Sequence, residues 1–99
     1  MDSSIFVKFL IREGAQKMKI DMIPEDLRKE VYIEAAKILF EQKNVIDAIY
    51  CWQKADVEMP KEELIRIANN EFSIGNRGLA VFIYKAIKAD KMAEFIEKN

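Results

Sequence analysis

The feature that most limits the possible fold is an internal similarity between residues 35–55 and residues 67–87. The two segments share small, aromatic and turn-forming residues at the same interval. An interval of 32 positions separates each of four pairs: Ala36 and Ala68, Asn44 and Asn76, Ala48 and Ala80, and Trp52 and Tyr84. Similarity at a fixed spacing of this size is typical of supersecondary units that stack on one another. The sequence therefore predicts one structural unit that occurs twice.

Apolar residues recur at intervals of three and four along most of the chain, which indicates amphipathic helices. We expect a long helix over about 25–42, followed by a tight turn at Lys43 and Asn44. Three further helices have the inner faces Val45, Ala48, Ile49, Trp52 and Ala55; Leu64, Ile67, Ala68 and Phe72; and Leu79, Ala80, Ile83, Tyr84 and Ile87. No stretch alternates at period two, so the predicted fold class is all-α, with antiparallel helical hairpins that stack.

Each end of the chain is predicted to add one helix. Ser3 or Ser4 caps the first, whose apolar face consists of Ile5, Phe6, Phe9 and Leu10. Gly14 either ends this helix or only weakens it, since Met18 would extend the same stripe. Pro24 breaks the pattern and starts the next helix. Asp90 is expected to cap a last short helix in which Met92, Phe95 and Ile96 cover the end of the stack.

Charge and length argue against several classes of protein. The 99 residues suit one domain, and 16 basic against 17 acidic residues give a formal charge of −1. Such a balance provides no field that attracts nucleic acid or an anionic membrane. The apolar stretch from Ile5 to Ile11 is interrupted by Lys8 and is far shorter than the roughly 20 residues of a membrane span. It also lacks the features of a secretory signal.

Cysteine and histidine usage argues against an enzyme. Histidine is absent, which removes the commonest acid and base at neutral pH and every histidine-dependent nucleophile or metal site. Cys51 is the single cysteine, so an intramolecular disulfide and a multi-cysteine metal site are excluded, and a reducing cytoplasm is expected. We therefore predict no catalytic residues, no cofactor and no metal.

The first of the two units resembles a tetratricopeptide repeat, a helix-turn-helix module whose pattern is W-x-x-L-G-x-x-Y, then A-x-x-x-F and a closing proline. Tyr32 stands in the tryptophan position, Ala35 and Ala36 in the leucine and glycine positions, and Leu39 in the tyrosine position. The second helix and closing positions are filled by Ala48, Trp52, Ala55 and Pro60. The second unit follows the same pattern at Leu64, Ile67, Ala68, Ala80 and Tyr84.

Together with the length of the chain, the resemblance predicts a single helical-repeat domain over residues 1–99, in which residues 1–24 match nothing in the motif. It divides into an N-terminal helix and linker at 1–23, a first repeat at 24–60, a second at 61–92 and a C-terminal cap at 90–99. In the family, the first helix of each repeat lines a groove that receives a peptide or a helix of another protein. Carried over by helix face, the partner-binding residues are Ile33, Lys37, Phe40, Ile65, Arg66, Asn69 and Phe72.

Several of these side chains have competing interpretations. Lys37, Arg66 and Asn69 have the donors to hold a peptide carboxylate. Glu34 and Glu41 on the same surface oppose that role, and a solvated face of mixed charge is the alternative that we favour. Trp52 is interpreted as a core residue rather than a binding hot spot, and Cys51 as a buried thiol rather than a redox switch.

The predicted function is thus that of a non-enzymatic module that binds a protein or peptide partner. The alternative is a self-associating structural subunit, because two repeats leave an apolar flank that a second copy can cover. Nucleic-acid recognition ranks third, since helical arrays read RNA but the charge here is balanced.

Overall fold

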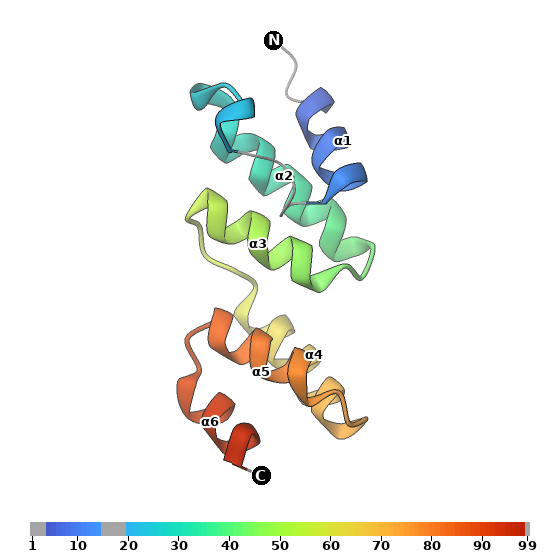
Figure 1. Ribbon diagram of the computed structural model, residues 1–99, viewed down its shortest axis with the longest axis vertical. Helices are drawn as coiled ribbons and strands as arrows, with labels where there is room; N and C mark the ends of the chain where they lie inside the picture. The colour runs from blue at the N-terminus through green and yellow to red at the C-terminus, as the bar shows by residue number, and fades with distance from the viewer. Residues whose placement is uncertain (1–3, 15–19, 99) are drawn as a thin grey trace. The chain divides into compact units, whose positions relative to one another are not determined.

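The computed structural model describes residues 4–14 and 20–98, and this part of the chain consists of helices and turns without any strand (Figure 1). The predicted all-α class is confirmed. The chain divides into two compact units, the first ending at Val57 and the second beginning at Glu58. Ser3 and Met18, which the sequence placed at a cap and in an extended first helix, lie outside the described residues.

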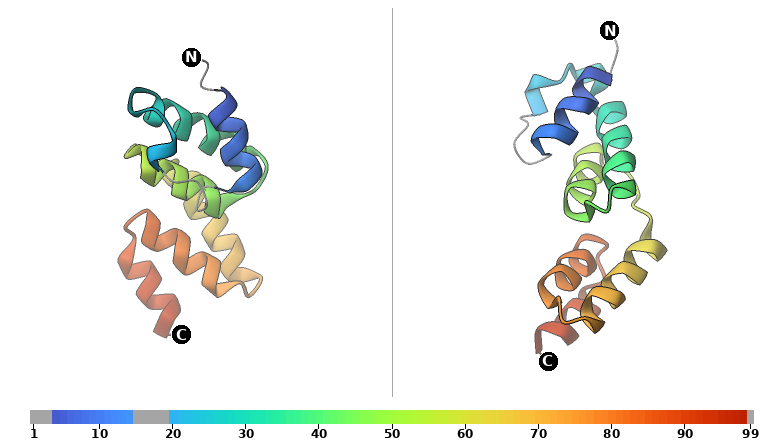
Figure 2. Two further views of the ribbon diagram at one scale, coloured as in Figure 1. Left: turned by 45° about the horizontal axis from the view of Figure 1, so that its top comes forward. Right: turned by 90° about the vertical axis from the view of Figure 1, so that its right-hand side faces the viewer.

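The first unit contains three α-helices. They are α1 (Ser4–Glu13), α2 (Arg28–Glu41) and α3 (Val45–Ala55). The longest of them, α2, packs against both α1 and α3 (Figure 2). The core of this unit is made of fully buried side chains from all three helices and from Ile23: Leu10, Ile23, Val31, Tyr32, Ala35, Ala36, Leu39, Ala48, Ile49 and Cys51.

Two short 3-10 turns, η1 (Ile20–Met22) and η2 (Glu25–Leu27), lead into α2. The predicted helix over 25–42 therefore begins as a 3-10 turn, closed by a hydrogen bond from the Leu27 amide to the Pro24 carbonyl at 2.9 Å. Arg28 then donates from Nε to the carbonyl of Ile23, also at 2.9 Å. These bonds satisfy the carbonyl groups of Ile23 and Pro24 just before α2.

The second unit contains α4 (Lys61–Ser73), α5 (Arg77–Ala86) and α6 (Asp90–Lys98). Here α5 packs against both α4 and α6 (Figure 1). Its buried core side chains are Leu64, Ala68, Ala80, Ile83, Tyr84, Ala93 and Ile96. The guanidinium of Arg77 also donates to the carbonyl of Ile96, which ties the start of α5 to the last turn of α6.

The turns inside the two hairpins have the same hydrogen bonds at an offset of 32. The amide of Lys43 donates to Phe40 and that of Gly75 to Phe72, both at 3.0 Å. The amide of Asn44 reaches Leu39 at 2.9 Å, and that of Asn76 reaches Glu71 at 2.8 Å. Lys43 and Gly75 have φ angles of 67° and 92°, the left-handed conformation in which a helix usually ends.

The ends of α3 and α5 match in the same way. Asp56 and Lys88 are left-handed, with φ angles of 54° and 62°. The next amides, of Val57 and Ala89, donate to the carbonyls of Trp52 and Tyr84. After this point the correspondence ends, because α4 starts at residue 61 and α6 at residue 90, which is three residues earlier than the offset requires.

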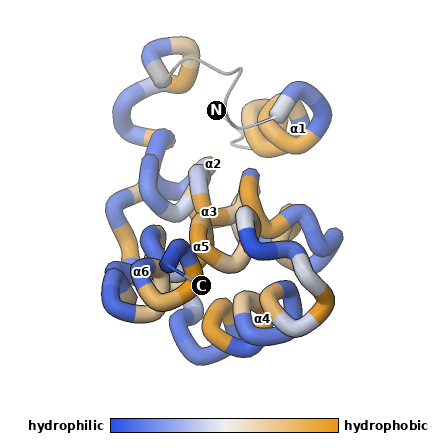
Figure 3. Tube along the Cα trace, turned by 60° about the horizontal axis from the view of Figure 1, so that its bottom comes forward, coloured by the Kyte–Doolittle hydropathy of each residue, from blue (hydrophilic) through white to orange (hydrophobic). Residues whose placement is uncertain are grey.

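The two terminal helices bury only part of the faces that the sequence predicted. Hydrophobic residues are frequent along α1 (Figure 3). In α1, Val7 and Leu10 are buried, Phe6 and Phe9 are half-buried, and Ile5 is 65% exposed. The predicted face was only partly right, because six of the ten residues of α1 are apolar and the main neighbour of this helix among the described elements is α2. Gly14, with a φ angle of 95°, ends this helix, since its amide closes onto Leu10 at 2.8 Å.

In α6 the buried residues are Ala93 and Ile96, whereas Met92 and Phe95 are 45% and 58% exposed. Only Ile96 of the three predicted covering residues is therefore in the core. The Asp90 cap was also misplaced: the amides of Met92 and Ala93 donate to the carbonyl of Ala89, so Asp90 belongs to the first turn. Its carboxylate still favours the helix there, since it faces the positive end of the helix dipole.

Candidate interaction surfaces

The predicted partner-binding residues fall on one helix of each unit. Ile33, Lys37 and Phe40 belong to α2, and the other four belong to α4: Ile65, Arg66, Asn69 and Phe72. The binding role of all seven stays a prediction. We describe the two groups separately.

The group on α2 combines exposed and anchored side chains. Ile33 is 39% exposed and Lys37 is exposed. Phe40 is half-buried because its ring meets Trp52 edge-to-face, with the ring centroids 5.3 Å apart and an interplanar angle of 62°. Such a pair stabilises by about 0.5–1.5 kcal/mol beyond the area it buries. Phe40 is thus held in place by the fold and presents only part of its ring to solvent.

The group on α4 contains two exposed polar residues, Arg66 and Asn69, between the half-buried Ile65 and Phe72. Asn69 is oriented by the fold, because its Oδ1 accepts a hydrogen bond from the hydroxyl of Tyr84. Among the described residues its amide nitrogen has no partner, so it keeps its donors for solvent or a ligand.

Cys51 and Tyr32 lie in the core of the first unit. Burial, together with the nearby Asp47, raises the pKa of the Cys51 thiol to about 12. The thiol is therefore protonated at neutral pH and is a poor nucleophile. Burial raises the pKa of Tyr32 as well, with Cys51 acting in the same direction and Arg28 against it. The Tyr32 hydroxyl is buried and has no hydrogen-bond partner among the described residues.

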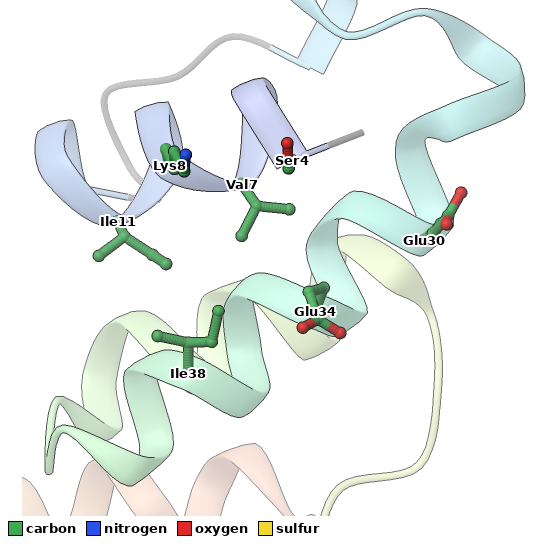
Figure 4. A pocket seen from close by; sticks show the side chains of 7 residues that line it. All are labelled: Ser4, Val7, Lys8, Ile11, Glu30, Glu34 and Ile38. Atoms are coloured by element: carbon green, nitrogen blue, oxygen red, sulfur yellow. The ribbon is translucent and has the colours of Figure 1, made fainter. Parts of the chain in front are cut away.

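A cleft between α1 and α2 was not foreseen from the sequence (Figure 4). Its volume is about 300 Å³. Its lining residues recur at intervals of three and four on α1 and of four on α2: Ser4, Val7, Lys8 and Ile11 on α1, and Glu30, Glu34 and Ile38 on α2. This spacing was a usable signal for one face of each helix, but the pairing of the two faces required the packing of α1 on α2.

Within the ranges 4–14 and 20–98, no helix has the length and apolar character needed to cross a lipid bilayer. The same residues form no group of three or more acidic or cysteine side chains placed to hold a metal ion.

Comparison of the chain with protein-family models, with curated proteins and with solved structures gave no match. That the two hairpins are tetratricopeptide repeats therefore remains a prediction, which rests on the sequence pattern described above.

Proposed function

We propose that this protein is a non-enzymatic interaction module that binds a peptide or a helix of a partner protein through the exposed faces of α2 and α4. The observation that carries the proposal is the equivalence of the two hairpin turns, whose hydrogen bonds and left-handed residues repeat at an interval of 32. Equivalent hairpins present equivalent first helices, and that is the element on which the resembling family binds its partners.

Exposure of the side chains on these helices supports the proposal. Ile33, Lys37 and Arg66 lie on the first helix of a hairpin, and their side chains are exposed and therefore accessible to a partner. Phe40 and Phe72 add partly accessible rings to the same helices. Aromatic side chains and arginine are enriched among residues that dominate binding energy.

The test is capture of a partner from an extract of the organism that makes the protein, followed by titration of the purified partner. A Lys37→Glu/Arg66→Glu variant should bind about tenfold or more weakly, because it reverses the charge of two side chains on the proposed binding surface. A Lys54→Glu/Lys91→Glu variant is the matched control, since it makes the same change of charge on exposed residues of α3 and α6. Equal binding by both variants would place the contact elsewhere.

Self-association is a second candidate, favoured by one observation. The terminal helices expose the large apolar side chains of Ile5, Met92 and Phe95. Exposed apolar surface of this kind is often covered by a second subunit. Light scattering distinguishes the two functions: a stable dimer that protects Phe40 and Phe72 supports assembly, whereas a monomer with those rings accessible supports peptide binding.

A further inference from the structure

We propose that the cleft between α1 and α2 binds a peptide segment of a partner protein in which an aliphatic side chain lies next to a lysine or arginine. This site uses none of the seven residues proposed above, so it holds or fails independently of them. The argument rests on the apolar floor of the cleft and on the charges around it.

The floor consists of aliphatic side chains from both helices. Val7 and Ile11 of α1 extend toward α2, and Ile38 of α2 extends toward α1 (Figure 4). Val7 is buried, while Ile11 and Ile38 are half-buried and keep part of their apolar surface toward solvent. A cleft of about 300 Å³ lies at the small end of known ligand pockets. A space of this size suits an inserted aliphatic side chain, whose burial removes apolar surface from water.

The wall formed by α2 is acidic. Glu30 and Glu34 lie one turn apart on the same face of α2, and both are exposed. Neither makes a salt bridge with another described residue, in contrast to the pairs Arg12–Glu13 and Lys85–Glu97. Two carboxylates that have no cationic partner among the described residues therefore lie beside the apolar floor.

Among the described residues that line the cleft, Lys8 is the charged residue contributed by α1. The described lining residues thus have an excess of one negative charge, since they include two glutamates and one lysine. Lys8 is exposed, and its long side chain is able to turn toward water when a cation enters. An anionic segment would instead meet Glu30 and Glu34, so charge complementarity selects a basic partner.

The proposal is tested by fluorescence anisotropy of the full chain at low salt with a labelled amphipathic peptide of leucine and lysine. Two matched peptides replace lysine by glutamate or leucine by serine. We expect saturable binding of the leucine–lysine peptide and binding at least about tenfold weaker for each matched peptide. A Glu30→Gln/Glu34→Gln variant should bind the first peptide about tenfold more weakly, and Lys8→Gln about threefold more tightly.

The control for general charge attraction is Glu62→Gln/Glu63→Gln, which removes the same charge from exposed residues of α4. It should leave affinity within about twofold of the unchanged protein. An equal loss in both double variants would overturn the proposal, as would undiminished binding of the serine–lysine peptide or no saturable binding. A second copy of the protein that covers the cleft would also contradict the proposal. Analytical ultracentrifugation without peptide would then show a molecular mass that rises with protein concentration.

Discussion

At the scale of single residues, Tyr32 and Tyr84 differ in one respect. Both rings are buried, but the Tyr84 hydroxyl donates to Asn69 while the Tyr32 hydroxyl has no partner among the described residues. A buried polar group without a hydrogen bond has lost its hydration, and no interaction in the folded protein offsets this cost. The same chemical change should therefore have opposite effects at the two positions.

We predict that Tyr32→Phe raises the free energy of unfolding by about 1 kcal/mol and that Tyr84→Phe lowers it by about 1 kcal/mol. The first removes an unpaired hydroxyl, and the second removes a hydrogen bond and leaves Asn69 without its donor. Urea unfolding at neutral pH, followed by circular dichroism, measures both values. A loss of stability in Tyr32→Phe would show that its hydroxyl has a favourable interaction in the folded protein.

Burial of the Cys51 thiol makes the stability of the protein depend on pH. Its pKa is raised from 9.0 to about 12 in the folded protein, chiefly by burial. Well below pH 9 the thiol is protonated in both the folded and the unfolded chain, so it has no effect on the pH dependence of stability there. Above pH 9 the unfolded chain loses the proton first, which favours unfolding. Stability must therefore fall as the pH rises from 9 toward 12.

Between pH 9 and pH 10 we expect the free energy of unfolding to fall by up to about 1 kcal/mol through Cys51. Cys51→Ala lacks the thiol and should show a smaller fall over the same interval, although it is less stable at every pH because it creates a cavity. Urea titrations at pH 8, 9 and 10 give the slope for each protein. Parallel slopes in the two proteins would mean that the pKa of the thiol does not differ between the folded and unfolded states.

At the scale of elements, the two hairpin turns have the same backbone but different residues at the left-handed position. Gly75 adopts that conformation freely, whereas Lys43 adopts it against the steric preference of an L-residue. A Cβ atom added at Gly75 would meet no atom within 4 Å, so only the backbone conformation opposes a side chain there. Substitutions at Lys43 and Gly75 therefore measure the conformational preference for glycine without a contribution from side-chain packing.

Lys43→Gly should stabilise the protein by about 0.5–1 kcal/mol, and Gly75→Ala should destabilise it by about 1 kcal/mol. Gly78→Ala is the control. This glycine lies in the first turn of α5, its φ angle is not positive, and open space surrounds its Cβ position. Alanine should therefore stabilise there by about 0.5–1 kcal/mol. Thermal or urea unfolding measures the three changes, and a stabilising Gly75→Ala would contradict the assigned turn.

At the scale of the whole molecule, a short connection joins two units that each have their own core. Residues 56–60 between α3 and α4 belong to no helix. Glu58 is exposed, and its backbone makes no hydrogen bond with another described residue. Backbone of this kind is where proteases cut folded proteins first.

Limited digestion with a glutamate-specific protease should therefore cleave after Glu58 before it cleaves after helical residues such as Glu34 and Glu63. Mass spectrometry of early time points identifies the fragment 1–58. Glu58→Gln should abolish this early fragment and leave the later helical cuts unchanged. Earlier cleavage inside α2 or α4 would show that those helices open more readily than the connection does.

The sequence by itself determined the helices and the turns between them, because apolar periodicity and turn residues act within a few positions of the chain. Thus α3 and α4 begin at Val45 and Lys61, as expected, and Asn44 and Asn76 lie in equivalent turns. Core residues of α2 and α5, such as Ala36 and Ala80, were equally predictable, because each of these helices packs against two neighbouring helices.

Only the tertiary structure decided which part of a broad apolar face is covered. Neighbouring helices bury Val7 and Ile96 but leave Ile5 and Phe95 exposed, and no local pattern specifies where a neighbour lies. The cleft lined by Glu30 and Glu34 arises for the same reason, since it exists only where α1 packs on α2. Helix formation depends on residues close in sequence, whereas burial and clefts depend on residues that folding brings together.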